Sequence, residues 1–299
     1  MTIYVSYKEN NGAGIGHNSV YIFYLLNFIS KFNHIEYIHT PFLRTSKDYD
    51  KLFGFNYTSI NKYKFKEMPN LNNVNELLIN KNQETTLYLI DEIFIRNNML
   101  EREISSECLY KIEKWKEQIR IDQKKYINYD KDCLNISVHI RRGDIMSNNI
   151  VKEEYKSRFL SEDYFLKVLQ RIETLYNGKL KITIISEGKE ENFENFKNKL
   201  KCKNIKLLIG RRHLETIDMK SKSISNLIFN DILITSPSGL SFLSSLYSTG
   251  VVIATNDKSK LNNPYLKNNN KQINNIFSIN KEEFNLLLEK YCNFNNKLN

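Results

Sequence analysis

The sequence predicts an α/β protein whose 299 residues form two domains with parallel sheets. Three observations lead to this expectation. The chain exceeds a single core of roughly 100–200 residues. Short β-prone runs alternate with apolar helical segments, and polar or glycine-rich residues follow several of the β-prone runs. Such alternation is typical of parallel strands covered by helices on both faces.

The N-terminal half opens with a strand, a glycine loop and a helix. Residues 2–7 are β-prone, residues 12–18 hold three glycines, and residues 19–32 have the composition of an apolar helix. This order is the start of a βαβ unit. Residues 35–39 are the next expected strand, whereas residues 44–83 are rich in Asn and Lys and show no clear pattern.

A second well-defined strand is expected over residues 86–90, and Asp91 and Glu92 follow it directly. Residues 104–126 carry apolar side chains at helical spacing with many charges between them, which predicts an amphipathic helix. We expect the domain boundary within residues 128–133.

The two predicted domains are residues 1–130 and residues 131–299. The strands expected in the second domain are residues 134–139, 182–186, 205–209, 231–235 and 251–254. The helices expected there are residues 161–176, 190–200, 217–229, 240–248 and 281–291. Ligands of parallel sheets bind beyond the carboxyl ends of the strands, so residues that follow these strands are candidates for a site.

Charge favours acidic partners. The chain has 44 Lys and Arg against 34 Asp and Glu, a net charge of +10, which suits nucleotide phosphates, anionic lipid headgroups or nucleic acid. The lysines are scattered, however, and form no sustained basic block, which favours an ordinary solvated surface. Aromatic side chains gather in apolar runs such as residues 21–28 rather than among basic residues, so we expect no nucleic-acid partner.

The cysteines give no sign of a metal or a disulfide framework. They are widely spaced and form no CxxC pair: Cys108, Cys133, Cys202 and Cys292. The first residues do not resemble a signal peptide, and no apolar run approaches about 18 residues. We expect a cytoplasmic protein without a metal, for which any membrane contact would be peripheral, at the inner membrane face.

Residues 139–144 (HIRRGD) follow a buried-type strand and place two guanidinium groups at its end. Adjacent residues of a strand point to opposite faces, so one arginine is expected to clamp a phosphate while the other holds the loop. Asp144 can pair with either. The alternatives are a basic surface loop and an RGD-like adhesion sequence, and the latter would need an exported protein.

This hexapeptide resembles the His-x-Arg-Arg-x-Asp motif of the α-1,2- and α-1,6-fucosyltransferases and the protein O-fucosyltransferases. The resemblance implies a GT-B-like fold of two Rossmann-type domains with a cleft between them. It also implies an inverting, metal-independent transfer of fucose from GDP-fucose. By the same resemblance, Arg141 contacts the β-phosphate, His139 lies near the nucleotide, and Arg142 belongs to the same site. Asp144 is expected to organise the arginine loop.

A second motif lies within residues 230–246, where a strand leads into a turn rich in hydroxyls and then into a helix of small residues. Hydroxyls and backbone N–H groups at a helix N-terminus form an anion site. Ser238 or Ser241 would also cap the helix. The segment is similar to the family's C-terminal motif, whose serines touch the diphosphate, which implies this role for Ser236, Ser238 and Ser241. Gly239 and Leu240 depart from the pattern.

Glu187 ends the strand over residues 182–186. A carboxylate there can accept the N1–H and N2–H groups of guanine, although it can equally be a favourable charge at a helix N-terminus. The fucosyltransferases have an acidic residue, usually Asp, after the corresponding strand.

The N-terminal glycine loop lacks the GxGxxG spacing with an acidic residue about 20 positions later, which disfavours a nicotinamide enzyme. It resembles the family's Gly-x-Gly-Asn-Gln element, which lines the sugar side of the cleft, so Gly14, Gly16 and His17 are candidate donor-site residues. His17 stands where Asn is frequent, and a lone histidine is more often structural.

The sequence names no general base for the acceptor hydroxyl, although the transfer requires one. Some relatives carry a carboxylate ten residues after the motif histidine, where this chain has Asn149. Other carboxylates near strand ends or in loops are Asp91, Glu92, Asp144, Glu153, Glu154 and Glu187. The acceptor is expected to be an oligosaccharide or lipid-linked glycan, such as a surface polysaccharide or lipopolysaccharide, bound by the N-terminal domain. The alternatives are a different nucleotide-sugar donor on the same fold and, less favoured, a basic nucleic-acid-binding protein.

Overall fold

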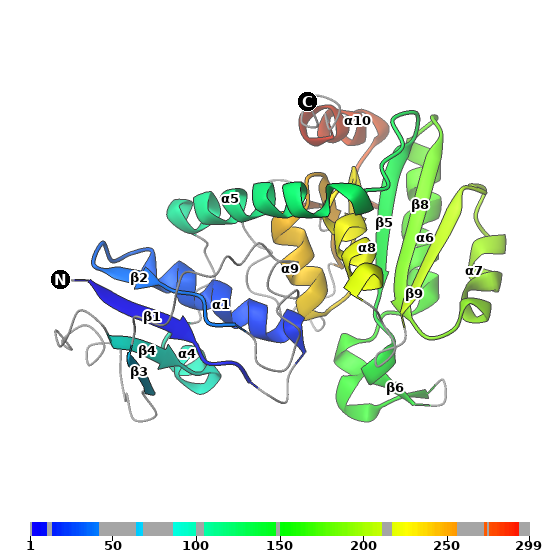
Figure 1. The fold of residues 1–299 in the computed structure, drawn as a ribbon. Helices are drawn as coiled ribbons and strands as arrows, with labels where there is room; N and C mark the ends of the chain where they lie inside the picture. The colour runs from blue at the N-terminus through cyan, green and yellow to red at the C-terminus, as the bar shows by residue number, and fades with distance from the viewer. Residues whose placement is uncertain are drawn as a thin grey trace. The chain divides into compact units, whose positions relative to one another are not determined.

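The computed structural model describes residues 2–10, 14–41, 64–67, 86–99, 105–147, 150–210, 217–255, 272–273 and 275–292. The chain divides into two compact units, Met1–Asp122 and Gln123–Asn299, which we call unit 1 and unit 2. This division falls a few residues before the boundary drawn from the sequence at residue 130. Each unit is an α/β layer structure on a parallel sheet, so the predicted α/β class is confirmed (Figure 1).

Unit 1 contains a four-stranded sheet of order β2-β1-β4-β3, in which each described pair of neighbours is parallel. Its strands are β1 (Ile3–Tyr7), β2 (Ile35–Tyr37), β3 (Lys64–Glu67) and β4 (Thr86–Ile90). Its helices are α1 (Ile15–Ile29), α4 (Glu92–Asn98) and α5 (Ser106–Gln123). Strand β3 was not expected, because its KFKE sequence has no apolar pattern beyond one Phe.

Helix α1 begins at Ile15, four residues before the start expected from the sequence. Gly14 is its N-cap residue, and its carbonyl accepts the backbone N–H groups of His17 and Asn18. The glycines of this segment indicated a loop, yet a helix's first turn tolerates them since its N–H groups need no intrahelical partner. His17 therefore lies on the first turn of α1 rather than in a loop.

Unit 2 contains a six-stranded sheet of order β12-β11-β10-β5-β8-β9, with every neighbouring pair parallel. The strands are β5 (Leu134–Ile140), β8 (Leu180–Glu187), β9 (Ile205–Gly210), β10 (Ile232–Ile234), β11 (Val251–Ile253) and β12 (Gln272–Ile273). Counted from β5, this is the 3-2-1-4-5-6 order of Rossmann folds. The strand order reverses between β5 and β10.

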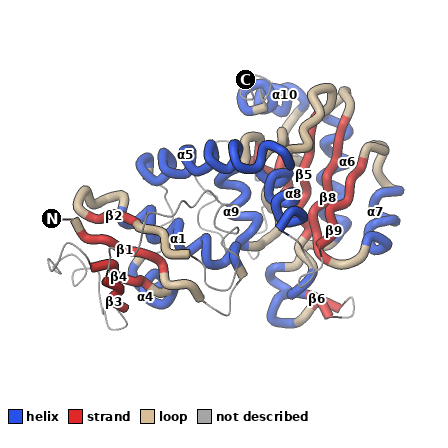
Figure 2. The backbone as a smooth tube through the Cα atoms, in the orientation of Figure 1, coloured by secondary structure: helices blue, strands red, loops and turns tan. Residues whose placement is uncertain are grey.

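Helices cover both faces of this sheet (Figure 2). The larger core cluster packs one face against α6 (Glu162–Leu175), α7 (Glu194–Asn198) and α10 (Lys281–Tyr291). The opposite face packs against α8 (Ile217–Ile228) and α9 (Gly239–Tyr247). After β5 the chain forms a 3-10 turn, Gly143–Ile145, and later a second, Glu153–Arg158.

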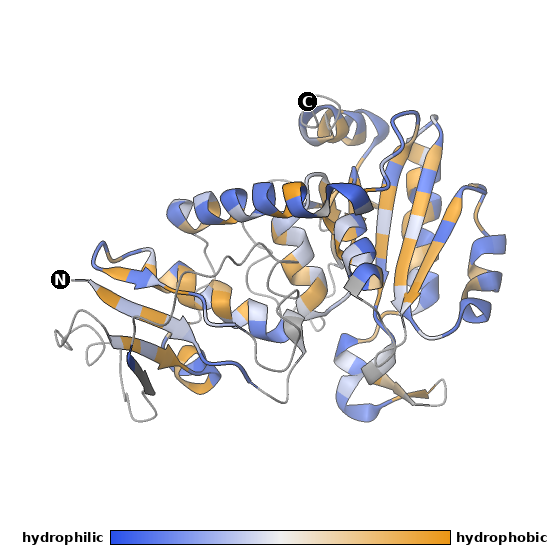
Figure 3. Cartoon of the chain, viewed as in Figure 1, coloured by the Kyte–Doolittle hydropathy of each residue, from blue (hydrophilic) through white to orange (hydrophobic). Residues whose placement is uncertain are grey.

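Strand β5 is buried on both faces, but one face is apolar and the other is polar. Figure 3 shows this mixture of hydrophobic and hydrophilic residues along the strand. The apolar set, Leu134, Ile136, Val138 and Ile140, lies in the core with α6. The alternate residues are polar. Ser137 Oγ donates a 2.6 Å hydrogen bond to the carbonyl of Asn226 on α8, and His139 faces α9 in the same way. Because side chains alternate along a strand, the polar face ends at the motif histidine.

Within the described ranges, no helix has both the length and the apolar composition needed to cross a bilayer.

Candidate functional site

The principal site lies in unit 2, where the carboxyl ends of β5 and β10 meet. These strands pair directly, with Ile136 beside Ile232 and Val138 beside Ile234. The HIRRGD segment leaves β5 at this point, and the serine turn leaves β10. The sheet order reverses between the same two strands, which is where parallel sheets bind ligands.

His139 is the last polar residue of β5 and is only 7% exposed. Its Nδ1 atom lies 2.6 Å from Ser241 Oγ and 3.4 Å from Ser238 Oγ, both at the start of α9. Burial, reinforced by the charge of Arg141, lowers the pKa of His139 to about 4. The imidazole is therefore neutral at physiological pH.

The three predicted serines bind the end of β5 to the start of α9. The Ser236 hydroxyl donates to the carbonyl of His139 and accepts the backbone N–H of Arg141 at 3.0 Å. The backbone N–H of Ser236 donates to Ser241 Oγ at 3.0 Å. Ser238 caps α9, because its hydroxyl accepts the backbone N–H of Ser241 at 3.0 Å. These hydroxyls fix the shape of the turn, whatever else they contact.

Arg141 lies on the α9 side of the sheet and is partly exposed. Its Nη1 atom donates a 3.1 Å hydrogen bond to the carbonyl of Pro237, the residue just before the N-cap Ser238. The first N–H groups of α9 have no acceptor within the helix and carry its positive partial charge. A guanidinium group and a helix N-terminus thus lie side by side, an arrangement suited to an anion.

Arg142 lies on the opposite side and is buried. Its guanidinium donates to the carbonyls of Arg141 at 2.9 Å and Leu160 at 3.2 Å, and pairs with Glu162 at 3.3 Å. It also lies 4.9 Å above the ring of Phe159. Strand-like alternation accounts for the division: Arg141 contacts the serine turn, and Arg142 contacts the start of α6.

Two carboxylates lie at this loop: Glu187, which the sequence named, and Glu162, which it did not. Glu162, the partner of Arg142, was missed, although acidic residues behind a Ser cap are a readable sign of a helix start. Asp144 was expected to pair with one of the two arginines, and its side chain is not among the described ones. Glu187 lies against Gly143, where a Cβ atom would come within 1.2 Å of Glu187 Oε2. Gly143 also has φ +48°, which favours glycine.

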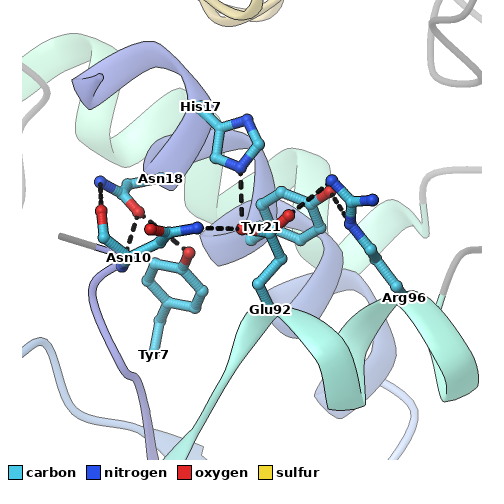
Figure 4. A network of polar contacts seen from close by, with 7 residues as sticks. All are labelled: Tyr7, Asn10, His17, Asn18, Tyr21, Glu92 and Arg96. Atoms are coloured by element: carbon cyan, nitrogen blue, oxygen red, sulfur yellow. Dashed lines mark hydrogen bonds and ion pairs between the residues drawn. The ribbon is translucent and has the colours of Figure 1, made fainter. Parts of the chain in front are cut away.

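The remaining predicted residues lie in unit 1, and of these His17 belongs to the polar cluster that Figure 4 shows. Gly14 and Gly16 form the start of α1, and His17 follows them. His17 Nε2 lies 2.9 Å from Oε2 of Glu92, the first residue of α4. Sequence reasoning named both residues separately but did not join them.

Glu92 is the centre of this cluster. It accepts Asn10 Nδ2 at 2.7 Å and pairs with Arg96 Nη2 at 2.5 Å, and its side chain is only 13% exposed. Burial alone would raise its pKa, but the hydrogen bonds from Asn10 and His17 and the charge of Arg96 outweigh this effect, so the pKa of Glu92 is lowered. Glu92 is a stable carboxylate.

Three further side chains complete the cluster. The Tyr7 hydroxyl donates to Asn18 Oδ1 at 2.9 Å, and Arg96 Nε donates to the Tyr21 hydroxyl at 2.7 Å. Burial raises the pKa of Tyr7 and of Tyr21, so both hydroxyls stay protonated. The signal that could have found this cluster is the presence of polar residues after both β1 and β4, neighbours in the sheet.

The other carboxylates considered as a base have different surroundings. Asp91 caps α4 by accepting the backbone N–H of Phe94 at 2.8 Å. Glu153 is exposed and pairs with Lys156. Asn149 lies outside the described residues. In the part of the chain that the structure describes, no three His, Cys, Asp or Glu side chains are grouped as metal ligands.

No protein-family model and no curated protein matches the chain. Solved structures with a similar chain trace include two heptosyltransferases. One is the E. coli ADP-heptose LPS heptosyltransferase II, with 11% identity over 97% of this chain and 99% of that chain and a TM-score of 0.40. The other is the E. coli heptosyltransferase WaaC with ADP-2-deoxy-2-fluoro heptose, with 9% identity, the same coverage of both chains and a TM-score of 0.40.

Proposed function

We propose that this protein is a glycosyltransferase that moves fucose from GDP-fucose to the hydroxyl of a glycan, with inversion and without a metal ion. The observation that carries the proposal is the position of Arg141. Its guanidinium adjoins the N-terminus of α9, at the reversal of strand order in the unit 2 sheet. The HIRRGD sequence that delivers this arginine is the one that resembles the fucosyltransferases.

The diphosphate is the group that this arrangement suits. When the sugar C1–O bond breaks, negative charge builds up on the β-phosphate oxygen, and donors fixed in advance lower the barrier. Arg141 provides a permanent charge, and the first N–H groups of α9 provide a dipole. Arg142 is engaged with Leu160 and Glu162, so its role is to hold the loop that presents Arg141.

His139 contributes shape rather than charge in this proposal. Its pKa of about 4 keeps it neutral, and Ser241 and Ser238 hold its Nδ1 edge. The imidazole borders the nucleotide, and Arg141 neutralises the negative charge of the diphosphate. Glu187, next to Gly143 at the end of β8, is the proposed acceptor for the N1–H and N2–H groups of guanine.

The acceptor half of the reaction is assigned to unit 1. We expect a glycan acceptor, either a free oligosaccharide or one carried by a lipid, and a cytoplasmic enzyme that meets the membrane peripherally. The net charge of +10 supports contact with anionic headgroups. The runner-up keeps the transferase and changes the donor, for example to a UDP-linked or ADP-linked sugar.

Thermal unfolding with GDP, UDP and ADP tests the donor. A ligand at 100 times its Kd stabilises by about 2.7 kcal/mol, which is roughly 5–10 °C for a unit of this size. GDP is expected to give this shift, and Arg141→Ala is expected to abolish it. Lys167→Ala, which removes an exposed charge on α6, is the matched control and should keep the shift.

Turnover of GDP-fucose, followed as GDP release, then tests the reaction. A larger shift with UDP or ADP would replace guanosine as the base and leave a nucleotide-sugar transferase in place. The absence of a shift with all three nucleotides, together with the absence of GDP release, would contradict the proposed function.

A further inference from the structure

The polar cluster of unit 1 occupies the same kind of position as the site of unit 2. Among the described strands of unit 1, the order reverses between β1 and β4, which pair in parallel. Asn10 follows β1 and Glu92 follows β4. His17 lies on the first turn of α1, the helix that comes after β1 in the chain. A histidine and a carboxylate therefore meet at the edge of the sheet where ligands bind.

The hydrogen bonds of Glu92 fix the tautomer of His17. An ionised carboxylate can only accept hydrogen bonds, and the lowered pKa of Glu92 keeps it ionised. His17 Nε2, 2.9 Å from Glu92 Oε2, must therefore carry the proton. In the neutral ring, the lone pair is then on Nδ1. Within the described residues, Nδ1 has no hydrogen-bond partner.

Exposure separates the two residues. The His17 side chain is 38% exposed, whereas that of Glu92 is only 13% exposed. Glu92 also accepts a hydrogen bond from Asn10 and forms an ion pair with Arg96. Both interactions stabilise its charged form and make it a poor proton acceptor. The imidazole is thus the basic group that an incoming molecule can reach, and the carboxylate orients it.

The other groups around His17 keep their charge near neutral pH. The Tyr21 ring lies 4.9 Å from the imidazole, and burial raises the pKa of both Tyr21 and Tyr7. Arg96, paired with Glu92 and the Tyr21 hydroxyl, stays positive. A proton taken up by His17 would therefore lie opposite the carboxylate of Glu92.

We infer that His17 is the general base for the acceptor hydroxyl and that Glu92 is its positioning residue. This inference rests on the function proposed above. The acceptor oxygen forms a bond to C1 of the donor sugar, and the C1–O bond to the diphosphate breaks with its electron pair leaving on the nucleotide. The hydroxyl proton passes to His17 Nδ1. The imidazolium, held by Glu92, later releases that proton to water.

The tautomer can be measured without any substrate. Two-bond ¹⁵N–¹H correlation spectra of the protein labelled at its five histidines should include the signals of a His17 ring that carries its proton on Nε2 and has a bare Nδ1 at neutral pH. These signals should disappear in His17→Gln and persist in His34→Gln, which changes an exposed histidine of the same unit. A proton on Nδ1 of His17 at neutral pH would overturn the inference.

Kinetics tests the role itself. The glutamine of His17→Gln can still donate from its amide to Glu92 but offers no basic nitrogen. Turnover of GDP-fucose, with water and with lactose as probe hydroxyls, should fall by about 100-fold or more. The KM for GDP-fucose and the thermal shift with GDP should change by less than about twofold. His34→Gln should match the wild type in all of these.

The split between turnover and KM gives a readout that a merely structural residue would not move. Glu92→Gln should lose about tenfold in turnover, because the imidazolium then has a neutral partner. Its KM for GDP-fucose should stay within about twofold of the wild type.

The outcomes separate the two proposals. Normal turnover in His17→Gln, with GDP still stabilising the protein, would overturn the base and leave the transferase intact. No stabilisation by any nucleotide would contradict the transferase, and the ¹⁵N spectra would still decide whether His17 has the bare Nδ1 that a base requires.

Discussion

The two histidines at the two sheet edges have opposite surroundings. His139 is buried among hydroxyls with the charge of Arg141 near it, and its pKa falls to about 4. His17 is partly exposed and backed by the carboxylate of Glu92. In the proposed mechanism, the histidine at the end of β5 is thus a neutral wall in unit 2, and the histidine on the first turn of α1 is the proton acceptor in unit 1. Burial and the sign of the nearest charge decide between these roles.

The largest expected effect comes from placing a permanent charge at each position. His139→Lys would bury an ammonium beside Arg141 without a carboxylate partner, which should destabilise unit 2 by about 3–5 kcal/mol. His17→Lys places the ammonium at a partly exposed site facing Glu92, where the change should stay below about 1 kcal/mol. Urea unfolding of both variants measures the difference. Equal losses would mean that the two environments do not differ as described.

Acid should act next most strongly, and through His139. Its pKa is about 4 in the folded protein and about 6.5 in the unfolded chain, so the unfolded state binds more protons between these values. Above a pH of about 6.5 the ring is neutral in both the folded and the unfolded chain, so His139 does not lower the free energy of unfolding. As the pH falls toward 4, the stability of unit 2 should drop by about 3 kcal/mol from this residue alone.

Unfolding free energies from pH 7 to 4 check this slope. In His139→Gln, which cannot be protonated in this range, the part of the slope due to His139 should vanish, while the rest of the acid dependence stays. An unchanged slope in that variant would show that His139 is not the residue that titrates.

The unit 2 site was more readable from sequence than the unit 1 cluster, for a physical reason. His139 and the two arginines are contiguous, so the alternation of strand side chains separates Arg141 from Arg142 without knowledge of the fold. Most strands and helices were also predicted, because their periodicity is local. The partner of Arg142 was missed, since the contact to Glu162 spans 20 positions and depends on how α6 packs.

In unit 1 the informative contacts are all long-range. His17 and Glu92 are 75 positions apart, and Asn10 and Glu92 are 82 apart. They meet because β1 pairs with β4, a pairing that no local pattern specifies. The glycines before His17 also indicated a loop, and this hid its place on the first turn of α1. A lone histidine in a loop has no visible partner, whereas the folded chain gives it one.

The smallest effect separates the glycines that precede or follow these histidines. Gly143→Ala should cost about 1–2 kcal/mol, because φ is +48° and the new methyl would displace the Glu187 carboxylate. Glu187 can move since its end is flexible, so the fold should survive while any preference for GDP over UDP declines.

Gly14→Ala is the matched change in unit 1: a Cβ there meets nothing within 4 Å, and the cost should stay below about 1 kcal/mol. Unfolding curves and nucleotide-dependent thermal shifts of both variants measure this. If Gly143→Ala kept its full preference for GDP while losing stability, Glu187 would be a structural residue of the arginine loop and not the group that reads guanine.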